Sequence, residues 1–215
     1  MNCPIKLSEI HCQNCYWNRR WIAESEPSCK SVALAQEFEK QGWDVWTCDT
    51  QPSEGWHKHI QDDIMNHLDD GWDMGIFHPD CTIKANSGVR WLFQLPGRYE
   101  QMLIDCDFFN QLLSAKIPMV CVEHPIIHKY AKVHIIKEYN QIVQPHYFIG
   151  SNESKATCLW LVGLDELQRT QWLDKSEIKQ SVWRHPPSPD RKINRARNSP
   201  AIAKAMAEQW GNLKQ

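Results

Sequence analysis

Cys81 and Glu123 are two side chains with complementary chemistry, and each comes at the end of a short apolar run. Cys81 lies in the segment GIFHPDCTIKANSG, and Glu123 lies in the segment IPMVCVEHP. A thiolate can add to a polarised ring while a carboxyl group protonates or hydrogen-bonds that ring and spreads the charge. The plainer interpretation is a small buried cysteine and a surface carboxylate, and spacing alone favours it.

Four cysteines cluster in the first thirty residues with the spacing C-x8-C-x2-C-x13-C. They are Cys3, Cys12, Cys15 and Cys29. Four thiolates suit a tetrahedral Zn²⁺ ion, and the same set could hold an iron-sulfur cluster. Independent burial is the alternative, but residues 1–30 show little apolar periodicity and offer little core. We therefore predict a loop-rich metal knuckle at residues 1–30, with zinc favoured because nothing in the sequence demands redox chemistry.

Basic residues near the C-terminus and near Cys81 are candidates for phosphate contacts. The C-terminal segment carries Arg184, Arg191, Lys192, Arg195 and Arg197, and Arg90 and Arg98 follow Cys81. Clusters of this kind neutralise nucleic-acid phosphates, although a solvated charged surface is the alternative.

The remaining cysteines and the histidines are interpreted as structural. Cys48, Cys106, Cys121 and Cys158 lie within apolar stretches and are predicted core residues. Ten histidines in 215 residues produce close pairs by chance, such as those at 57 and 59 or at 124 and 128. Surface or helix-capping roles are therefore expected for them.

Composition and length favour one main globular domain in the cytoplasm. The chain has 215 residues, a formal net charge of -2 and eleven tryptophans. The charge excludes a global basic field, so any nucleic-acid contact must come from a local patch. No apolar run approaches the length of a membrane span, and the odd number of cysteines, nine, argues against a disulfide framework.

Hydrophobic periodicity predicts strands that alternate with helices. Helices are expected from Ser31 to Gly42, over 98–115, around 126–136 and from about Pro200 to Gly211. Strands are expected at 44–47, 72–77, 117–123 and 156–163. This order predicts an α/β domain with a mainly parallel sheet, whose ligands bind outside the carboxyl ends of the strands. Cys81 and Glu123 both fall at such ends.

Several segments in a fixed order resemble the cytosine-C5 DNA methyltransferase family, especially short phage-type members that lack a target-recognition domain. They are DMGIFHPDCTIKANSG, VCVEHP, QPHYFIGSNESKATCLWL and NSPAIAKAMAEQW. The resemblance implies a class I methyltransferase-like, Rossmann-like domain over residues 31–215, with helices on both faces of the sheet. It also implies DNA or another cytosine-containing nucleic acid as partner, in a bacterial or phage-infected cell.

The resemblance carries roles onto individual residues. Cys81 would be the nucleophile that attacks cytosine C6, and Glu123 would contact the base. Asp49, in WTCDTQP, would bind the ribose of S-adenosylmethionine, and Asp63, in HIQDDI, would contact its adenine.

The sequence departs from the family pattern at three places. Asp80 stands where the family has a proline before the cysteine, and a neighbouring carboxylate is expected to raise the pKa of a thiol. His124 stands where the family has an asparagine, and residues 20–33 contain no glycine for the cofactor turn, whose place the knuckle would take. Two hypotheses follow: a cytosine-C5 methyltransferase-like enzyme, or an inactive nucleic-acid or partner-binding module stapled by a four-cysteine metal site. We favour the enzyme.

Overall fold

The computed structural model describes residues 14–19, 32–53, 55–180 and 199–211, and in this part of the chain seven strands form one sheet. In chain order the strands are β1 (Asn14–Arg19), β2 (Asp44–Asp49), β3 (His59–Gln61), β4 (Met74–Phe77), β5 (Met119–Pro125), β6 (Gln141–Val143) and β7 (Thr157–Val162). The helices are α1 (Val32–Lys40), α2 (Arg98–Leu113), α3 (Lys129–Lys132) and α6 (Pro200–Trp210), with 3-10 turns η1 (Ile64–Asn66), η2 (Val89–Trp91) and η3 (Pro145–Tyr147).

The strand order is β3-β2-β1-β4-β5-β7-β6, and the first five strands of the chain are parallel. β7 runs antiparallel between β5 and β6. The order 3-2-1-4-5 is that of doubly wound α/β folds, in which ligands bind beyond the carboxyl ends of the strands near the point where the order reverses. Here that point lies between β1 and β4, so the predicted mainly parallel sheet is confirmed.

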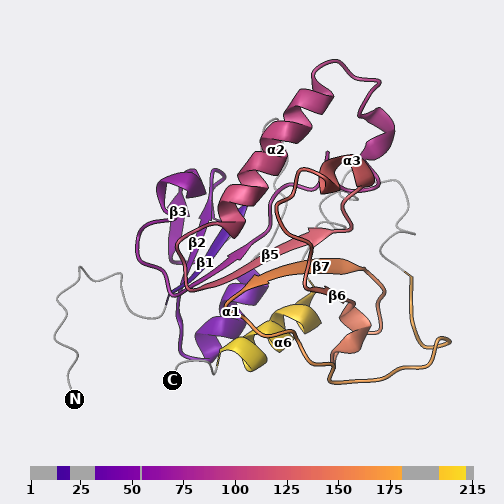
Figure 1. Ribbon diagram of the computed structural model, residues 1–215. Helices are drawn as coiled ribbons and strands as arrows, with labels where there is room; N and C mark the ends of the chain where they lie inside the picture. Colours follow the sequence, from indigo (N-terminus) through magenta and orange to yellow (C-terminus); the bar gives the residue numbers. More distant parts are fainter. Residues whose placement is uncertain (1–13, 20–31, 54, 181–198, 212–215) are drawn as a thin grey trace.

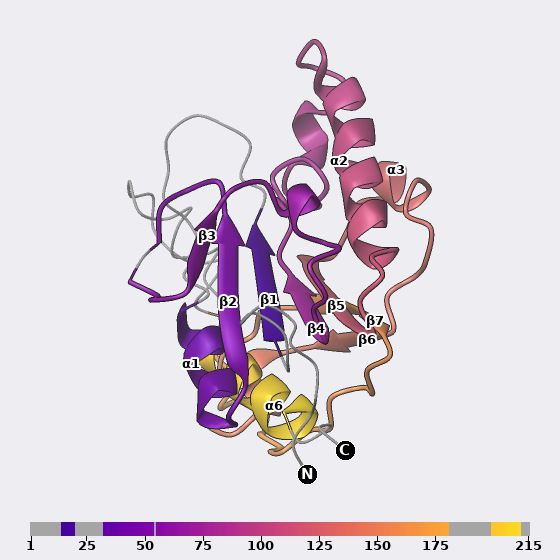
Figure 2. The ribbon, with the colours of Figure 1, turned by 90° about the vertical axis from the view of Figure 1, so that its left-hand side faces the viewer.

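Helices cover both faces of the sheet, as expected (Figure 1). Figure 2 shows α1 and α6 side by side on one face, with α2 and α3 on the other. Leu34, Ala35 and Phe38 form the buried stripe of α1, and α6 presents a row of small alanines that lets it approach closely. On the opposite face, Phe109 and Leu112 of α2 pack in one core with residues of β4 and β5.

The first thirty residues contain a strand, which corrects the expectation of a loop-rich knuckle there. β1 lies in the middle of the sheet, and its Cys15 is in register with Val45 of β2 and Met74 of β4. Backbone pairing on both sides defines this strand. Its sequence, NCYWNR, has no apolar period from which a buried strand could be predicted.

Most other predicted elements are confirmed. The helices at α1, α2 and α6 and the strands at β2, β4, β5 and β7 agree with the predicted segments within a few residues. The short strands β3 and β6 were not predicted. Four cysteines predicted to be core residues, Cys48, Cys106, Cys121 and Cys158, are buried, and burial raises the thiol pKa of Cys106 and of Cys158 to about 11. None of the helices in the described ranges is long and apolar enough to span a lipid bilayer.

Candidate active site at the carboxyl edge of the sheet

Cys81 and Glu123 belong to neighbouring strands of the sheet. β4 and β5 pair with Phe77 opposite Val122, so the residues that follow Phe77 run beside those that follow Val122. Cys81 lies in the loop after β4 and is partly exposed. Glu123 is still within β5, because this strand continues to Pro125 and does not end at Glu123 as expected. Both residues therefore lie at the carboxyl edge, where the sequence placed them.

His78 is the immediate neighbour of Glu123, and the sequence interpretation missed it. Its Nδ1 atom lies 3.3 Å from Oε2 of Glu123, and the exposed fractions of the two side chains are 5% and 11%. The position of His78, directly after an apolar run and three residues before Cys81, was the available signal. A buried imidazole at this distance can orient the carboxyl group and exchange a proton with it.

The Cys81 loop is a tight turn built around its own polar groups. Oδ1 of Asp80 accepts hydrogen bonds from the backbone N–H of Thr82 (3.2 Å) and from its hydroxyl (2.8 Å). The backbone N–H of Ala85 donates to the carbonyl of Cys81 at 2.9 Å. Asp80, which departs from the family pattern, therefore has a local structural role: its carboxylate closes the turn that carries Cys81.

A buried lysine lies beneath this turn. Lys84 is 1% exposed, and its Nζ donates to the carbonyl of Asp80 at 2.6 Å. The same ammonium lies 3.7 Å from Oδ2 of Asp105, a buried residue of α2 that also accepts a hydrogen bond from Gln101. Buried charges require such partners, so Lys84 ties the Cys81 loop to α2.

His128 holds the loop from the other side. Its Nε2 donates to the carbonyl of Ile83 (2.9 Å), and its Nδ1 accepts from the N–H of Ala131 (3.1 Å) at the start of α3. The backbone N–H of His128 donates to the carbonyl of Lys84 at 3.0 Å. Burial lowers the pKa of His128, and only the neutral ring can accept at Nδ1. The expected capping role is confirmed at this histidine.

His124 is the most deeply buried histidine near the site. Its Nδ1 donates to the carbonyl of Pro125 at 2.7 Å, and the edge of Phe109 packs on it. Its buried Nε2 has no hydrogen-bond partner of good geometry in the described part of the chain, although the backbone of Asp80 lies nearby. Burial, together with the charge of Lys84, lowers the pKa of His124 to about 3, so the ring is neutral near pH 7.

Gly88 closes the far end of the Cys81 loop, and we expect Gly88→Ala to disturb it. A Cβ atom at this position would lie 2.1 Å from the carbonyl oxygen of Thr82, which is backbone and cannot turn aside. Overpacking of this kind typically costs about 1–3 kcal/mol. Urea unfolding measures the loss. Ser87→Ala, at the exposed neighbouring position, is the control and should stay within about 0.5 kcal/mol of wild type; equal stability of the two variants would contradict the close approach.

The two predicted cofactor residues also lie at carboxyl ends of strands. Asp49 is the last residue of β2, and its carboxylate accepts a hydrogen bond from the N–H of Gln51 at 2.9 Å. Asp63 follows β3 and caps η1, where it accepts from the N–H of Met65 at 3.0 Å. Their positions agree with the expectation, and their roles toward a cofactor stay predictions.

Several predicted site residues lie outside the described part of the chain. They are Arg191, Arg195 and Arg197 of the basic segment and Cys3, Cys12 and Cys29 of the cysteine cluster. Cys15 is in β1. Within the ranges that the structure describes, no group of three or more Cys, His, Asp or Glu side chains could hold a metal ion. The zinc or iron-sulfur site therefore gains no support and stays a sequence prediction.

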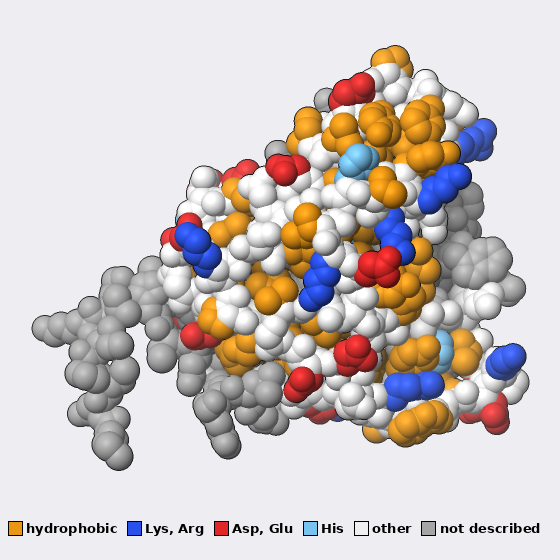
Figure 3. All heavy atoms as spheres, in the orientation of Figure 1, with side chains coloured by type: hydrophobic (Ala, Val, Ile, Leu, Met, Phe, Trp, Pro, Cys, Tyr) orange, Lys and Arg blue, Asp and Glu red, His pale blue; other side chains and the backbone are white. Residues whose placement is uncertain are grey.

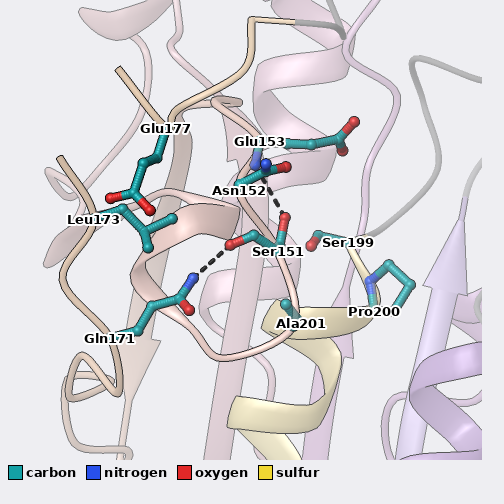
Figure 4. A pocket seen from close by; sticks show the side chains of 10 residues that line it. Ser151, Asn152, Glu153, Gln171, Leu173, Glu177, Ser199, Pro200 and Ala201 are labelled. Carbon is teal, nitrogen blue, oxygen red and sulfur yellow. Dashed lines mark hydrogen bonds between the residues drawn. The ribbon is translucent and has the colours of Figure 1, made fainter. Parts of the chain in front are cut away.

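A polar cavity of about 590 Å³ lies beside the start of α6 (Figure 4). Loop 150–153, the side chains of Gln171, Leu173 and Glu177, and Ser199–Ala201 line it. Glu153 donates its backbone N–H to the hydroxyl of Ser151 (3.2 Å), and the side chain of Gln171 donates to the carbonyl of Ser151. Loop 150–153 leads into β7, whose first residue, Thr157, pairs with Pro125 at the end of β5. The loop therefore enters the sheet at the same edge as Glu123.

The sequence matches no protein-family model and no curated protein. Among solved structures, a protein named a DNA modification methyltransferase, encoded within an E. coli prophage, aligns with 70% of this chain and 46% of its own, at 13% identity and a TM-score of 0.40. The Dnmt2 methyltransferase of S. pombe aligns with 74% of this chain and 51% of its own, at 12% identity and a TM-score of 0.41. The Entamoeba histolytica methyltransferase EhMeth aligns with 76% of this chain and 57% of its own, at 14% identity and a TM-score of 0.42. This chain therefore spans between 46 and 57% of the length of three methyltransferases to which it is distantly similar.

Proposed function

We propose that this chain is a cytosine-C5 methyltransferase-like protein that acts on cytosine in nucleic acid. One observation carries the proposal: neighbouring parallel strands bring the Cys81 loop and Glu123 to the same edge of the sheet, and His78 lies 3.3 Å from that carboxyl group. A nucleophile, an acid and an orienting imidazole are the groups that addition to a pyrimidine ring requires.

Cys81 and Glu123 would divide the chemistry between them. The sulfur of Cys81 would form a bond to C6 of the ring, and the electron pair of the C5–C6 double bond would move into the ring. Glu123 would hydrogen-bond or protonate the ring and so stabilise that charge, with His78 holding its carboxyl group in place. Once C5 carries the methyl group, loss of the C5 proton to water would re-form the C5–C6 double bond, the bond from sulfur to C6 would break, and Cys81 would leave as the thiolate.

S-adenosylmethionine would supply the methyl group. Asp49 fits this cofactor, because an acidic residue at the end of the second strand is where doubly wound folds bind a ribose, and its side chain lies at that strand end. Asp63 fits less directly, because its Oδ1 already caps η1. Residues 20–31, which follow β1, lie outside the described ranges.

A covalent-trapping experiment tests the proposal. The full chain is incubated with S-adenosylmethionine and an oligonucleotide that contains 5-fluorocytosine, and adducts are measured by denaturing gel and by mass spectrometry of the Cys81 peptide. We expect an adduct in wild type, none in Cys81→Ser, and a rate about 10²- to 10⁴-fold lower in Glu123→Gln, because the ring would lose its acid. Cys48→Ser, a buried cysteine in β2, is the matched control and should form the adduct.

The second candidate is a binding module that has lost methyl transfer. It is favoured by the absence of glycine from residues 20–33, since a cofactor turn normally needs close backbone approach. Calorimetric titration with S-adenosylmethionine separates the two. If S-adenosylmethionine gives no heat of binding at high micromolar concentration while the chain still binds the oligonucleotide, the enzyme proposal is contradicted and the binding module is favoured.

A further inference from the structure

Three exposed aromatic rings lie beside the Cys81 loop, and we name them the aromatic platform. They are Trp91, Phe93 and Tyr130, with exposed fractions of 43%, 66% and 37%. Phe93 makes a T-shaped contact with Tyr130, with 5.0 Å between the ring centroids, and stacks on Tyr99 with 5.8 Å between the centroids. The Cys81 loop, which leads into the segment that carries Trp91 and Phe93, is joined to the segment before α3 by the Ala85–Ile127 bridge. The platform is therefore a fixed part of the same edge as Cys81 and Glu123.

Each end of the platform carries a cation. The guanidinium of Arg90 lies 5.0 Å from the centre of the Trp91 ring, and Nζ of Lys129 lies 4.9 Å from the centre of the Tyr130 ring. Residues 89–99 and 126–133, which form this surface, contain no Asp or Glu. Glu100, in the first turn of α2, and Glu123 in the site flank these segments, and Glu138 reaches the surface, where its carboxylate lies 2.8 Å from Nζ of Lys132. The surface is locally positive although the whole chain is not.

Apolar side chains extend this surface. Leu95, Ile126 and Val133 are 46%, 43% and 77% exposed. Figure 3 shows hydrophobic side chains gathered over the part of the molecule where α2 and α3 lie, with Lys and Arg side chains at the edge of this area. Exposed apolar area of this kind marks an interaction surface.

We propose that the aromatic platform binds an unpaired stretch of nucleic acid, whose bases stack on the rings and whose phosphates contact Arg90 and Lys129. Partly exposed aromatic rings beside cations suit single strands, because every unpaired base presents a π-face next to a phosphate. A duplex hides its base faces. A second copy of this chain, paired through the same face, would bring cations against cations.

This inference rests on the proposed function and makes it more specific. The strand on the platform would be the one that presents a cytosine to Cys81, so unpaired cytosine would be the preferred substrate. A single strand needs no base flipping from a duplex stack, which lowers the cost of bringing a base to the site.

Fluorescence anisotropy with the full chain tests the platform. A labelled twelve-nucleotide single strand and the matching duplex are titrated over a range of salt concentrations. We expect tighter binding of the single strand, and Trp91→Ala and Phe93→Ala each to weaken it by about 5- to 100-fold, since stacking contributes that much per base. Arg90→Gln and Lys129→Gln should each lower the slope of log affinity against log salt by about 0.7.

Trp172→Ala is the matched control. Trp172 is 73% exposed, and the guanidinium carbon of Arg169 lies 5.7 Å from the centre of its ring. Trp172 lies in the segment after β7 and is not part of the platform. Its substitution should leave the affinity unchanged, and circular dichroism confirms that all variants fold. Unchanged affinity in the Trp91 and Phe93 variants would overturn the inference, as would a wild-type preference for duplex. Sedimentation that shows a wild-type dimer and monomeric platform variants would reassign the surface to self-association.

The two proposals fail separately. Binding of the single strand is measured by anisotropy and the covalent adduct by denaturing gel, so the two readouts are independent. If wild type binds the single strand through the platform but forms no covalent adduct, the enzyme proposal is contradicted and the platform proposal stands. If the adduct forms equally well in Trp91→Ala and Phe93→Ala, the platform proposal is contradicted and the enzyme proposal stands.

Discussion

Lys84→Met is expected to lower the free energy of unfolding by about 3–5 kcal/mol, because it leaves a buried carboxylate without its cation. Lys84 is 1% exposed, and its ammonium lies 3.7 Å from the carboxylate of Asp105, which is itself buried in α2. Methionine fills a similar volume but has no donor for Asp105 or for the carbonyl of Asp80. Urea unfolding followed by tryptophan fluorescence measures the change.

Lys204→Met is the matched control. Lys204 lies at the same distance, 3.7 Å, from the carboxylate of Glu208, but both side chains are about half exposed. An exposed pair one turn apart on a helix contributes only about 0.5 kcal/mol or less. A loss of similar size in Lys84→Met and Lys204→Met would mean that the buried pair does not stabilise the loop.

A double substitution separates the charge pair from packing. In Lys84→Met with Asp105→Leu, both charges are removed, and such replacements are often neutral. We expect this variant to recover most of the stability lost in Lys84→Met, with a coupling energy of about 2–3 kcal/mol. Faster alkylation of Cys81 by iodoacetamide in Lys84→Met, with partial reversal in the double variant, would show that the pair also positions the Cys81 loop.

Long periodic segments made much of the fold predictable. α2 shows apolar residues at helical spacing from Met102 to Leu113, and α6 begins at a proline and ends before a glycine. β4 and β5 are short apolar runs that needed no other signal. The strand β1 was not predicted, because its six residues, NCYWNR, show no apolar period, and only backbone pairing with both neighbours places them in the middle of the sheet. β3 and β6 have three residues each, too few for a period to be recognised.

The candidate site was predictable only in its chemistry-bearing residues. Cys81 and Glu123 were proposed from their places after apolar runs together with the family resemblance, and the order of the strands brings both to one edge. The residues that contact and position them were not predicted. His78 lies 45 positions from Glu123 in the sequence, and Lys84 lies 21 positions from Asp105. Such contacts depend on how α2 and β5 pack, and a single sequence carries no signal for them. Asp80 illustrates the same limit: its hydrogen bonds to Thr82 depend on the backbone path of the turn.

His124→Asn is expected to make the protein less sensitive to acid, and the sign follows from the direction of the pKa shift. Burial lowers the pKa of His124 from 6.5 to about 3. Between these values the unfolded chain holds a proton at this ring and the folded chain does not, so stability falls as the pH falls. The stability that the neutral ring contributes is complete above about pH 6.5 and is lost progressively below it.

The magnitude follows from one proton. From pH 7.0 to pH 5.0, a group with these two pKa values removes about 2 kcal/mol from the free energy of unfolding. Asparagine does not titrate, so His124→Asn should show a decline smaller by that amount, whatever its stability at pH 7.0. His128, whose pKa is also lowered by burial, remains in both proteins and leaves a common residual slope.

The pH window and the control make this prediction sharp. Measurements stop at pH 5.0 because unperturbed carboxyl groups titrate below that value. His57→Asn, the same substitution at an exposed position, is the control. If His124→Asn declines as steeply as wild type, then His124 is charged or solvated in the folded chain. A charged His124 would differ from an asparagine in charge as well as in shape, and it would be an additional proton donor beside Glu123.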